Sequence, residues 1–351
     1  MSKKKDQNNL ENNITDIEFG KDDEYEKTLR PKFLKDFIGQ TNFTSNLAVY
    51  IEATKKRKEP LDHILLAGPP GLGKTTLASI ISNEMNVNFK STSAPILEKA
   101  GDIAAILTDI EEGDVFFIDE IHRLKKNIEE LLYSAMEDYT MDIIIGQGAS
   151  AKSIKINIAK FTLIGATTRS GLISSPLRSR FGIVENLDFY TIEEMKKIIK
   201  RSANILNIEI DEDSLDILAR CSRGTPRVGN RILKRVRDFA QIEGKGKIDR
   251  EISYNALQRL NIDNLGLNKL DIKLLKILID NYDGGPVGAK TLAISIGEEV
   301  DTIEEIYEPF LIQIGFLKRT PRGRVATKKA YLHLGLEYKK EEKTLFEDEN
   351  F

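Results

Sequence analysis

The sequence predicts an α/β fold: a parallel β-sheet covered by helices on both faces, followed by two smaller units. Short apolar runs at 63–67, 114–118 and 161–166 alternate with helical patterns. Continuously apolar strands separated by helices are typical of a sheet that is buried on both sides. After about Tyr190 the strand patterns largely end and helical periodicity takes over, which predicts a separate helical domain.

The bulk composition limits the kinds of protein this chain can be. The 351 residues are enough for two or three domains, and the net charge of −3 means that any basic surface must be local. The single cysteine, Cys221, excludes an intramolecular disulfide, and three scattered histidines disfavour a structural zinc site. The lysine-rich start lacks a following apolar stretch, and no run of about 18 apolar residues exists to span a membrane. We therefore expect a cytoplasmic protein without a membrane segment.

A glycine-rich turn follows the first apolar run directly. It reads Gly68-Pro-Pro-Gly-Leu-Gly-Lys74-Thr75 and opens a helix predicted at 74–85. Glycines allow the backbone N–H groups of such a loop to surround a triphosphate, and the helix adds its positive dipole end. We expect Lys74 to reach the outer phosphates and the Thr75 hydroxyl to bind Mg²⁺, with Gly71, Gly73 and Thr76 in the same P-loop. ATP and Mg²⁺ are the predicted cofactors.

Two carboxylates, Asp119 and Glu120, end the second apolar run. Asp119 is predicted to hold Mg²⁺, directly or through water, and Glu120 to position and polarise the attacking water. An acidic helix cap is the simpler alternative, but the P-loop upstream favours a catalytic pair. His122 follows closely, and we expect it to pack or cap rather than to catalyse.

Arginines follow the third apolar run, in Ser175-Pro-Leu-Arg178-Ser-Arg180. Such arginines can form local salt bridges. Alternatively, one of them is an arginine finger that neutralises charge on the γ-phosphate bound by a neighbouring subunit.

Several motifs beyond these are specific in combination. They are Leu29-Arg-Pro, Phe37-Ile-Gly-Gln40, Gly165-Ala-Thr-Thr-Arg-Ser-Gly171, Arg223-Gly-Thr-Pro-Arg227 and Thr320-Pro-Arg-Gly-Arg324. With the P-loop and the Phe117–Leu124 segment, they make the chain resemble the RuvB family of bacterial AAA+ ATPases, Holliday-junction branch-migration motors, over about residues 28–336.

The resemblance implies roles for single residues. Arg180 would be the finger, Arg227 the sensor-2 residue of the helical domain, and Thr168 would take the sensor-1 place, where many AAA+ members carry asparagine. Further implied nucleotide contacts are Leu29, Arg30 and Tyr190 around the adenine, and Glu137, Asp138 and Tyr139.

The expected domain organisation is a P-loop AAA+ domain, a small helical lid domain and a C-terminal winged-helix domain. The small domain opens with a capping box, Thr191 to Glu194. The boundaries that we expect are a disordered polar tail at 1–25, the large ATPase domain at 26–190, the helical domain at 191–261, the winged helix at 264–336 and a polar tail at 337–351. Helices are predicted at 128–139, 191–206, 211–221, 226–242, 249–260, 270–281, 288–297 and 301–314.

Two segments are candidates for contact with partners. Residues 142–158 form a predicted hairpin whose apolar face, with Ile154 and Ile156, either packs on the protein's own core or binds a partner. The resemblance implies that this hairpin docks RuvA. Residues 318–329 are basic and suggest a wing that lies along a phosphate backbone, with Arg319, Arg322 and Arg324 as DNA contacts.

The function expected from these observations is ATP hydrolysis that drives branch migration of Holliday junctions in recombination and repair. The resemblance implies a homohexamer that pulls duplex DNA through its ring, with RuvA and a junction resolvase as partners. A clamp-loader subunit is one alternative, which the basic wing argues against. A DNA-binding regulator that uses ATP only as a switch is another, which the pair of Glu120 and Arg180 argues against.

Overall fold

The structure is a computed structural model, and it describes residues 28–145 and 152–338. The chain divides into two compact units between Ser253 and Tyr254, inside helix α10 (Arg250–Arg259). The large and small domains expected at 26–190 and 191–261 thus lie mostly in one unit. The tail expected at 1–25 and most of that at 337–351 lie outside the described residues.

A five-stranded parallel sheet forms the centre of the first unit, in the order β2-β3-β6-β1-β7. The strands are β1 (Ile64–Ala67), β2 (Phe89–Ser93), β3 (Val115–Asp119), β6 (Thr162–Thr167) and β7 (Ile183–Asn186). The three strands predicted from apolar runs are the three central ones, β1, β3 and β6, which confirms the predicted parallel sheet. The edge strands β2 and β7 were not predicted, because their residues are only half-buried or exposed and their sequences are correspondingly polar.

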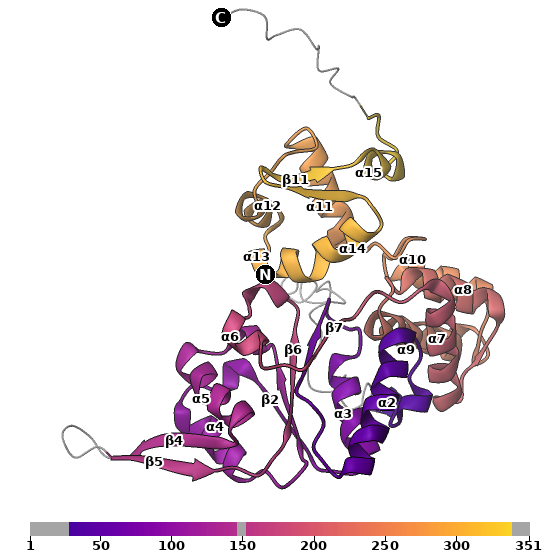
Figure 1. The fold of residues 1–351 in the computed structure, drawn as a ribbon. Coiled ribbons are helices and arrows are strands. Elements are labelled where there is room, and N and C mark those ends of the chain that lie inside the picture. Colours follow the sequence, from indigo (N-terminus) through magenta and orange to yellow (C-terminus); the bar gives the residue numbers. More distant parts are fainter. Residues whose placement is uncertain (1–27, 146–151, 339–351) are drawn as a thin grey trace, which may run out of the picture. The chain divides into compact units, whose positions relative to one another are not determined.

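Helices cover both faces of this sheet. Helices α2 (Thr41–Arg57) and α3 (Lys74–Met85) lie on one side, and α4 (Ala100–Thr108) and α5 (Lys126–Glu137) on the other (Figure 1). Large side chains such as Phe116 of β3 are completely buried beneath α4 and α5. Each such burial contributes about 1.5–3 kcal/mol, so this core holds the strands at fixed positions.

The carboxyl ends of the central strands meet at one edge of the sheet. The register pairs Ala67 with Thr167, and Ile118 with Gly165. The segments that follow β1, β3 and β6 therefore leave the sheet side by side. In parallel α/β sheets this edge is where ligands bind.

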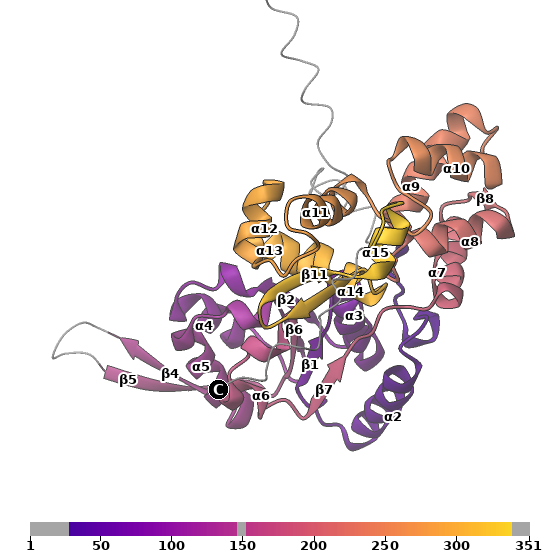
Figure 2. The same cartoon turned by 90° about the horizontal axis from the view of Figure 1, so that it is seen from above.

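An antiparallel hairpin, β4 (Thr140–Ile145) and β5 (Lys152–Asn157), extends away from the sheet (Figures 1 and 2). It confirms the predicted hairpin, whose turn at 146–151 lies outside the described residues. The pairs Thr140–Asn157 and Asp142–Lys155 set its register.

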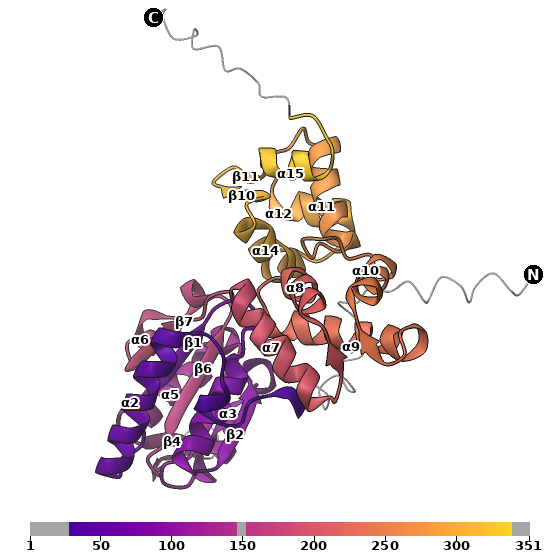
Figure 3. The ribbon, with the colours of Figure 1, turned by 90° about the vertical axis from the view of Figure 1, so that its right-hand side faces the viewer.

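A small helical lid completes the first unit (Figure 3). Its elements are α7 (Ile192–Ile205), β8 (Glu209–Ile210), α8 (Glu212–Cys221), α9 (Pro226–Glu243) and β9 (Lys247–Ile248). The predicted capping box is confirmed: the Glu194 N–H donates to Thr191 Oγ1 at 3.2 Å, and the Thr191 N–H donates to Glu194 Oε2 at 2.8 Å. Short turns of 3₁₀ or α-helix join the larger elements: η1 (Leu34–Asp36), η2 (Ala94–Ile96), η3 (Ile121–Arg123), η5 (Ser170–Leu172) and α6 (Ser175–Arg178).

The second unit has the winged-helix order of elements. These are α11 (Lys269–Asp280), α12 (Ala289–Ile296), α13 (Val300–Thr302), the π-helical η6 (Ile303–Tyr307), α14 (Glu308–Gln313), β10 (Leu317–Thr320), β11 (Gly323–Ala326) and α15 (Lys328–His333). An antiparallel backbone bridge joins Val287 to Arg324, so Val287 takes the place of a third strand beside β10 and β11. The hairpin of β10 and β11 is the wing.

The single helix predicted at 301–314 is divided into α13, η6 and α14. Pro309, near the start of α14, explains the break, because it has no N–H to donate to the preceding turn. The backbone there widens into a π-helical turn at Ile303–Tyr307. Within the described ranges, no helix combines the length and apolar character needed to cross a membrane.

Candidate active site

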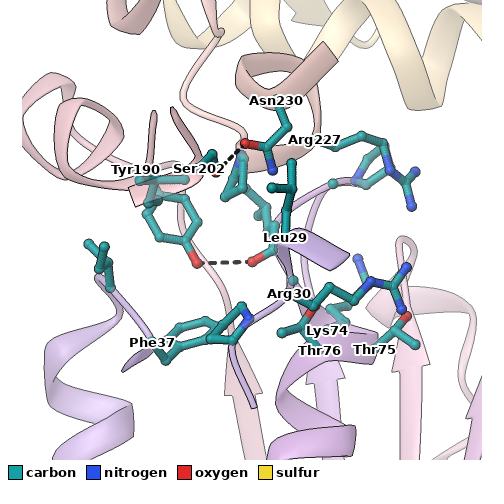
Figure 4. Close-up of a pocket in the computed structure, with 18 of the residues that line it drawn as sticks. Leu29, Arg30, Phe37, Lys74, Thr75, Thr76, Tyr190, Ser202, Arg227 and Asn230 are labelled. Atoms are coloured by element: carbon teal, nitrogen blue, oxygen red, sulfur yellow. Dashed lines mark hydrogen bonds between the residues drawn. The ribbon is translucent and has the colours of Figure 1, made fainter. Parts of the chain in front are cut away.

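A pocket lies between the carboxyl edge of the sheet and the lid, within the first unit (Figure 4). Most residues that the sequence assigned to a nucleotide line it. They are Leu29, Arg30, Gly71, Gly73, Lys74, Thr75, Thr76, Asp119, Glu120, Thr168, Tyr190 and Arg227.

The P-loop supplies a buried cation to this pocket. Gly73 has φ +98°, a conformation that favours glycine, and from it the chain enters α3 at Lys74. Lys74 is only 8% exposed, and its Nζ donates to the carbonyl oxygens of Gly68 at 2.7 Å and Pro69 at 2.9 Å. The ammonium group places positive charge at this end of the pocket, where it attracts anions.

The two carboxylates at the end of β3 face different partners. Asp119 Oδ1 accepts the backbone N–H of Glu120 at 2.9 Å, which supports the left-handed backbone of Glu120 (φ 49°). Glu120 Oε2 accepts from Arg123 at 2.9 Å in a partly exposed ion pair. Glu120 also lines the pocket, so its carboxylate lies at the border between the pocket and Arg123.

The donor set fits Mg²⁺ when the phosphates of a nucleotide are counted with it. Thr75 contributes a hydroxyl and Asp119 a carboxylate, and both line the pocket. Mg²⁺ in phosphate-transfer sites is held by one or two carboxylates, with phosphate oxygens and water completing the octahedron. Among the residues that the structure describes, no cluster of three His, Cys, Asp or Glu side chains could bind a metal without such help.

Thr168 follows β6 and lines the same pocket. Its Oγ1 is buried and has no hydrogen-bond partner among the described residues. A buried hydroxyl without a partner costs about 1–3 kcal/mol, which a bound ligand or water could offset. The position of Thr168 therefore suits contact with a phosphate or with the attacking water.

The far end of the pocket suits a nucleoside base. The Tyr190 hydroxyl donates to the Leu72 carbonyl at 3.0 Å, and burial raises the pKa of this phenol, so it stays neutral (Figure 4). Leu29 is buried, and its carbonyl accepts from Arg201 at 2.7 Å. Tyr190 and Leu29 thus form an apolar wall fixed by backbone contacts.

Sequence reasoning missed several residues at this end. Ser202 donates to Asn230 Oδ1 at 2.8 Å, and both line the pocket with Phe37 (Figure 4). One signal was present: Asn230 comes three residues after Arg227 in a predicted helix, so both lie on one face. Phe37 stands in the motif Phe37-Ile-Gly-Gln40 but was assigned no role, and Ser202 carried no such signal, because only tertiary folding brings it to the site.

Four predicted nucleotide contacts do not line this pocket: Glu137, Asp138, Tyr139 and Arg180. Arg180 instead forms an ion pair with Glu137 at 3.0 Å. Tyr139 packs edge-on against Phe161, with ring centroids 6.2 Å apart, and burial raises its pKa. This group lies together around the end of α5 and cannot contact a nucleotide held in the chain's own pocket.

His122 does not line the pocket either. Its Nδ1 lies 3.0 Å from the Thr167 hydroxyl, and burial lowers its pKa, which keeps the ring neutral near pH 7. This position agrees with the packing role expected for it.

The apolar face of the hairpin emerges from the core toward the tip. Ile158 is 7% exposed, Ile156 is half-buried, and Ile154 is 47% exposed. The face is therefore only partly covered by the chain's own core.

The three wing arginines are not equivalent. Arg319 and Arg322 are exposed, whereas Arg324 is 7% exposed. Arg324 forms ion pairs with Glu308 of α14, itself 1% exposed, and at 2.7 Å with Glu304 of η6. The guanidinium of Arg324 thus points into the domain, and its burial does not support the predicted DNA contact.

Known proteins are similar to this chain along nearly all of its described length. Three family models match consecutive segments: the Holliday junction DNA helicase RuvB P-loop domain at 29–187, the RuvB AAA lid domain at 190–263 and the RuvB C-terminal winged helix domain at 264–335. The chain is 59% identical to the Holliday junction branch migration complex subunit RuvB of Kosmotoga olearia, over 88% of this chain and 91% of the relative. It is 60% identical to the protein of that name from Treponema denticola, over 90% and 92% of the two chains.

A solved structure is similar over the same span. The Thermotoga maritima RuvB Holliday junction branch migration motor superposes with a TM-score of 0.82 at 54% identity, over 89% of this chain and all of the other.

Proposed function

Because this chain belongs to the RuvB family of Holliday junction DNA helicases, we propose that it is an ATP-driven motor that promotes branch migration of Holliday junctions in recombination and DNA repair. The P-loop, Asp119–Glu120 and Thr168 in one pocket carry this proposal, because together they form a hydrolytic site and not merely a binding site. Matches to all three RuvB domain models disfavour the two alternatives, a clamp-loader subunit and an ATP-switched regulator. A chromosomal substrate would put this activity in the cytoplasm.

ATP is the nucleotide that this pocket is proposed to bind. Lys74 and the P-loop amides hold its phosphates, Leu29 and Tyr190 enclose the adenine, and Arg30 lies beside them. Mg²⁺, held by Thr75 and Asp119, would neutralise charge on the β- and γ-phosphates. Glu120 orients and polarises the attacking water, and the unpartnered hydroxyl of Thr168 supports a role in holding that water or the γ-phosphate.

Arg180 is proposed to act on the nucleotide of a neighbouring subunit. Its place outside the chain's own pocket, paired with Glu137, supports this role, because from there Arg180 could meet a nucleotide only across an interface. A finger supplied in trans makes hydrolysis a property of a ring, and we propose a homohexamer around duplex DNA. Arg227 lines the pocket from α9, so a change at the phosphates would move the lid.

Duplex DNA is proposed to contact the wing through Arg319 and Arg322. In many winged-helix proteins the second helix of the helix-turn-helix enters the major groove. The corresponding segment here, 298–308, contains no Lys or Arg, and its acidic residues are Glu298, Glu299, Asp301, Glu304, Glu305 and Glu308. A phosphate backbone would be repelled by this helix, so the exposed cations of the wing are the better DNA contact.

RuvA is proposed to dock on the β4–β5 hairpin, at the exposed Ile154 and the half-buried Ile156. A junction resolvase is a further expected partner.

A four-way-junction dissociation assay tests the function. The protein is mixed with RuvA, ATP and Mg²⁺, and a linear duplex of the same sequences serves as control. We expect junction-specific dissociation that disappears in the Glu120→Gln variant. Failure to process the junction under conditions where ATP is hydrolysed would contradict the proposal.

A further inference from the structure

One face of helix α5 lies against Arg180. Glu129, Tyr133 and Glu137 are spaced by four residues along α5, so their side chains line up on one side of the helix. We refer to these three residues as the α5 row. None of them lines the chain's own nucleotide pocket.

Two members of the α5 row hold the guanidinium of Arg180. Its Cζ lies 4.4 Å from the centre of the Tyr133 ring, within the range of a cation–π contact. One terminal nitrogen donates to Glu137 Oε2 at 3.0 Å, and the other donates to the Pro176 carbonyl at 2.6 Å. The Arg180 side chain is only 18% exposed as a result.

Tyr133 is itself fixed by the third member of the row. Its hydroxyl donates to Glu129 Oε1 at 2.9 Å and lies 3.2 Å from Ser174 Oγ. Ser174 also contacts Glu129, and it caps α6 by accepting from the Leu177 N–H at 3.3 Å. The helix that supplies the ring and the turn that carries Arg180 are therefore joined at the same point.

We propose that Tyr133 and Glu137 are positioning residues that hold Arg180 in the orientation in which it meets a neighbouring subunit's nucleotide. This inference rests on the proposed role of Arg180 as a finger. A free arginine side chain samples many rotamers. If it is held in one rotamer before the reaction, less conformational entropy is lost on reaching the transition state. The cation–π contact with Tyr133 occupies none of the N–H donors, so a phosphate could take over the N–H group that donates to the exposed Glu137. Glu137 limits rotation of the guanidinium over the Tyr133 ring. Its carboxylate balances the positive charge until a phosphate takes its place as the partner of Arg180.

Mixed rings allow the finger and the hydrolytic site to be altered in different subunits. Acceptor subunits carry Arg180→Ala and keep Glu120, so they hydrolyse ATP only when a neighbour supplies a finger. Donor subunits carry Glu120→Gln and keep Arg180, so they supply a finger but do not hydrolyse. DNA-stimulated ATP turnover of the mixture then reports on fingers delivered by donors.

The test places Tyr133→Leu either in the donors or in the acceptors. In donors we expect kcat of the mixture to fall about tenfold or more with KM for ATP unchanged, because a misplaced catalytic group slows the step without weakening binding at the intact pocket. The same substitution in acceptors should leave turnover unchanged, because those subunits have no finger to position. Tyr133→Phe in donors should retain most of the activity, since the ring is kept. Tyr50→Leu, a partly exposed tyrosine on α2, is the matched control in donors.

Glu137→Ala provides a second variant at a side chain that is 57% exposed, where substitution does not disturb the core. In donors it should lower kcat several-fold without changing KM. A raised KM would show that Glu137 touches the nucleotide directly, and this would overturn its positioning role. Equal turnover with wild-type and Tyr133→Leu donors, or an equal loss when the substitution is in acceptors, would overturn the role of Tyr133. If the mixture of donors and acceptors that both keep Tyr133 and Glu137 is inactive, the assignment of Arg180 as a finger fails, and the positioning role fails with it.

Discussion

In the nucleotide pocket the cation is buried and held by backbone carbonyls, whereas the wing cations proposed to bind DNA lie at the surface, where Arg319 also pairs with Glu304 at 3.4 Å. Lys74 is 8% exposed and bound to two carbonyls, while Arg319 and Arg322 lie on the surface of a two-stranded turn. Only Arg324 of the wing resembles Lys74 in its burial, and it contacts carboxylates of its own domain. Phosphoryl transfer depends on fixed geometry. Binding to duplex of any sequence needs only outward positive charge.

The largest effect is expected for Lys74→Ala. Removing the buried ammonium takes away the main attraction for the outer phosphates, so ATP binding or hydrolysis should be lost. Equilibrium binding of a fluorescent ATP analogue and steady-state turnover measure the two steps separately. Turnover at the wild-type level would contradict the assignment of the phosphate site.

Arg324→Ala should destabilise the winged-helix unit by about 3–5 kcal/mol, because Glu308 would be left buried without its cation. Hydrogen exchange of the α14 amides measures this local stability. Arg322→Ala, on the exposed wing tip, is the control and should change it by less than about 0.5 kcal/mol.

The double variant Arg324→Met with Glu308→Leu sharpens this test. Apolar replacement of both partners should recover much of the lost stability, since no unpaired charge remains buried. If Arg324→Ala has no effect on stability yet abolishes DNA binding, Arg324 is a DNA contact and our interpretation of its burial is wrong.

Thr168→Val should lower kcat by about tenfold, which corresponds to about 1.4 kcal/mol, and leave KM for ATP nearly unchanged. The substitution preserves shape and removes a buried hydroxyl that has no partner among the described residues. The nucleotide-free protein should therefore be as stable as the wild type or slightly more stable in urea unfolding. A clear loss of stability would indicate that Thr168 is a structural residue.

The smallest effects are expected for single substitutions in the wing. Arg319→Ala and Arg322→Ala should each weaken duplex binding several-fold and reduce the slope of log affinity against log salt by about one. The weakening should be the same for unrelated sequences. Anisotropy titrations on two duplexes at several salt concentrations check both points, and a sequence-dependent loss would argue for base contacts.

The sequence predicted best what depends on local pattern. Apolar runs located β1, β3 and β6, and the glycine-rich turn with its following helix located the P-loop. The edge strand β2, with the polar sequence Phe89–Ser93, was missed because burial on one side leaves a weak pattern. The break at Pro309 was also missed, although a proline within a predicted helix predicts such an interruption.

In the candidate site, too, residues within local motifs were predicted, whereas contacts between distant parts of the chain were not. The P-loop with Lys74 follows β1, and Asp119 ends β3, so pattern predicted both, whereas Thr168 was assigned to the site only by the resemblance to the RuvB family. The partners of Arg180 and Arg324 could not be predicted this way. Tyr133 lies 47 positions before Arg180 in the chain, and Glu308 lies 16 before Arg324, so only the packed fold shows these contacts.

The small number of exposed cations on the wing has a consequence for how DNA is held. One subunit offers few phosphate contacts, and its acidic helix segment at 298–308 adds none, so its grip on a duplex should be weak and short-lived. In the proposed ring, copies would raise one another's effective concentration at the duplex, and avidity would replace single-site affinity. Each subunit would then release DNA at low cost while the ring stays bound, and rapid stepping requires this combination.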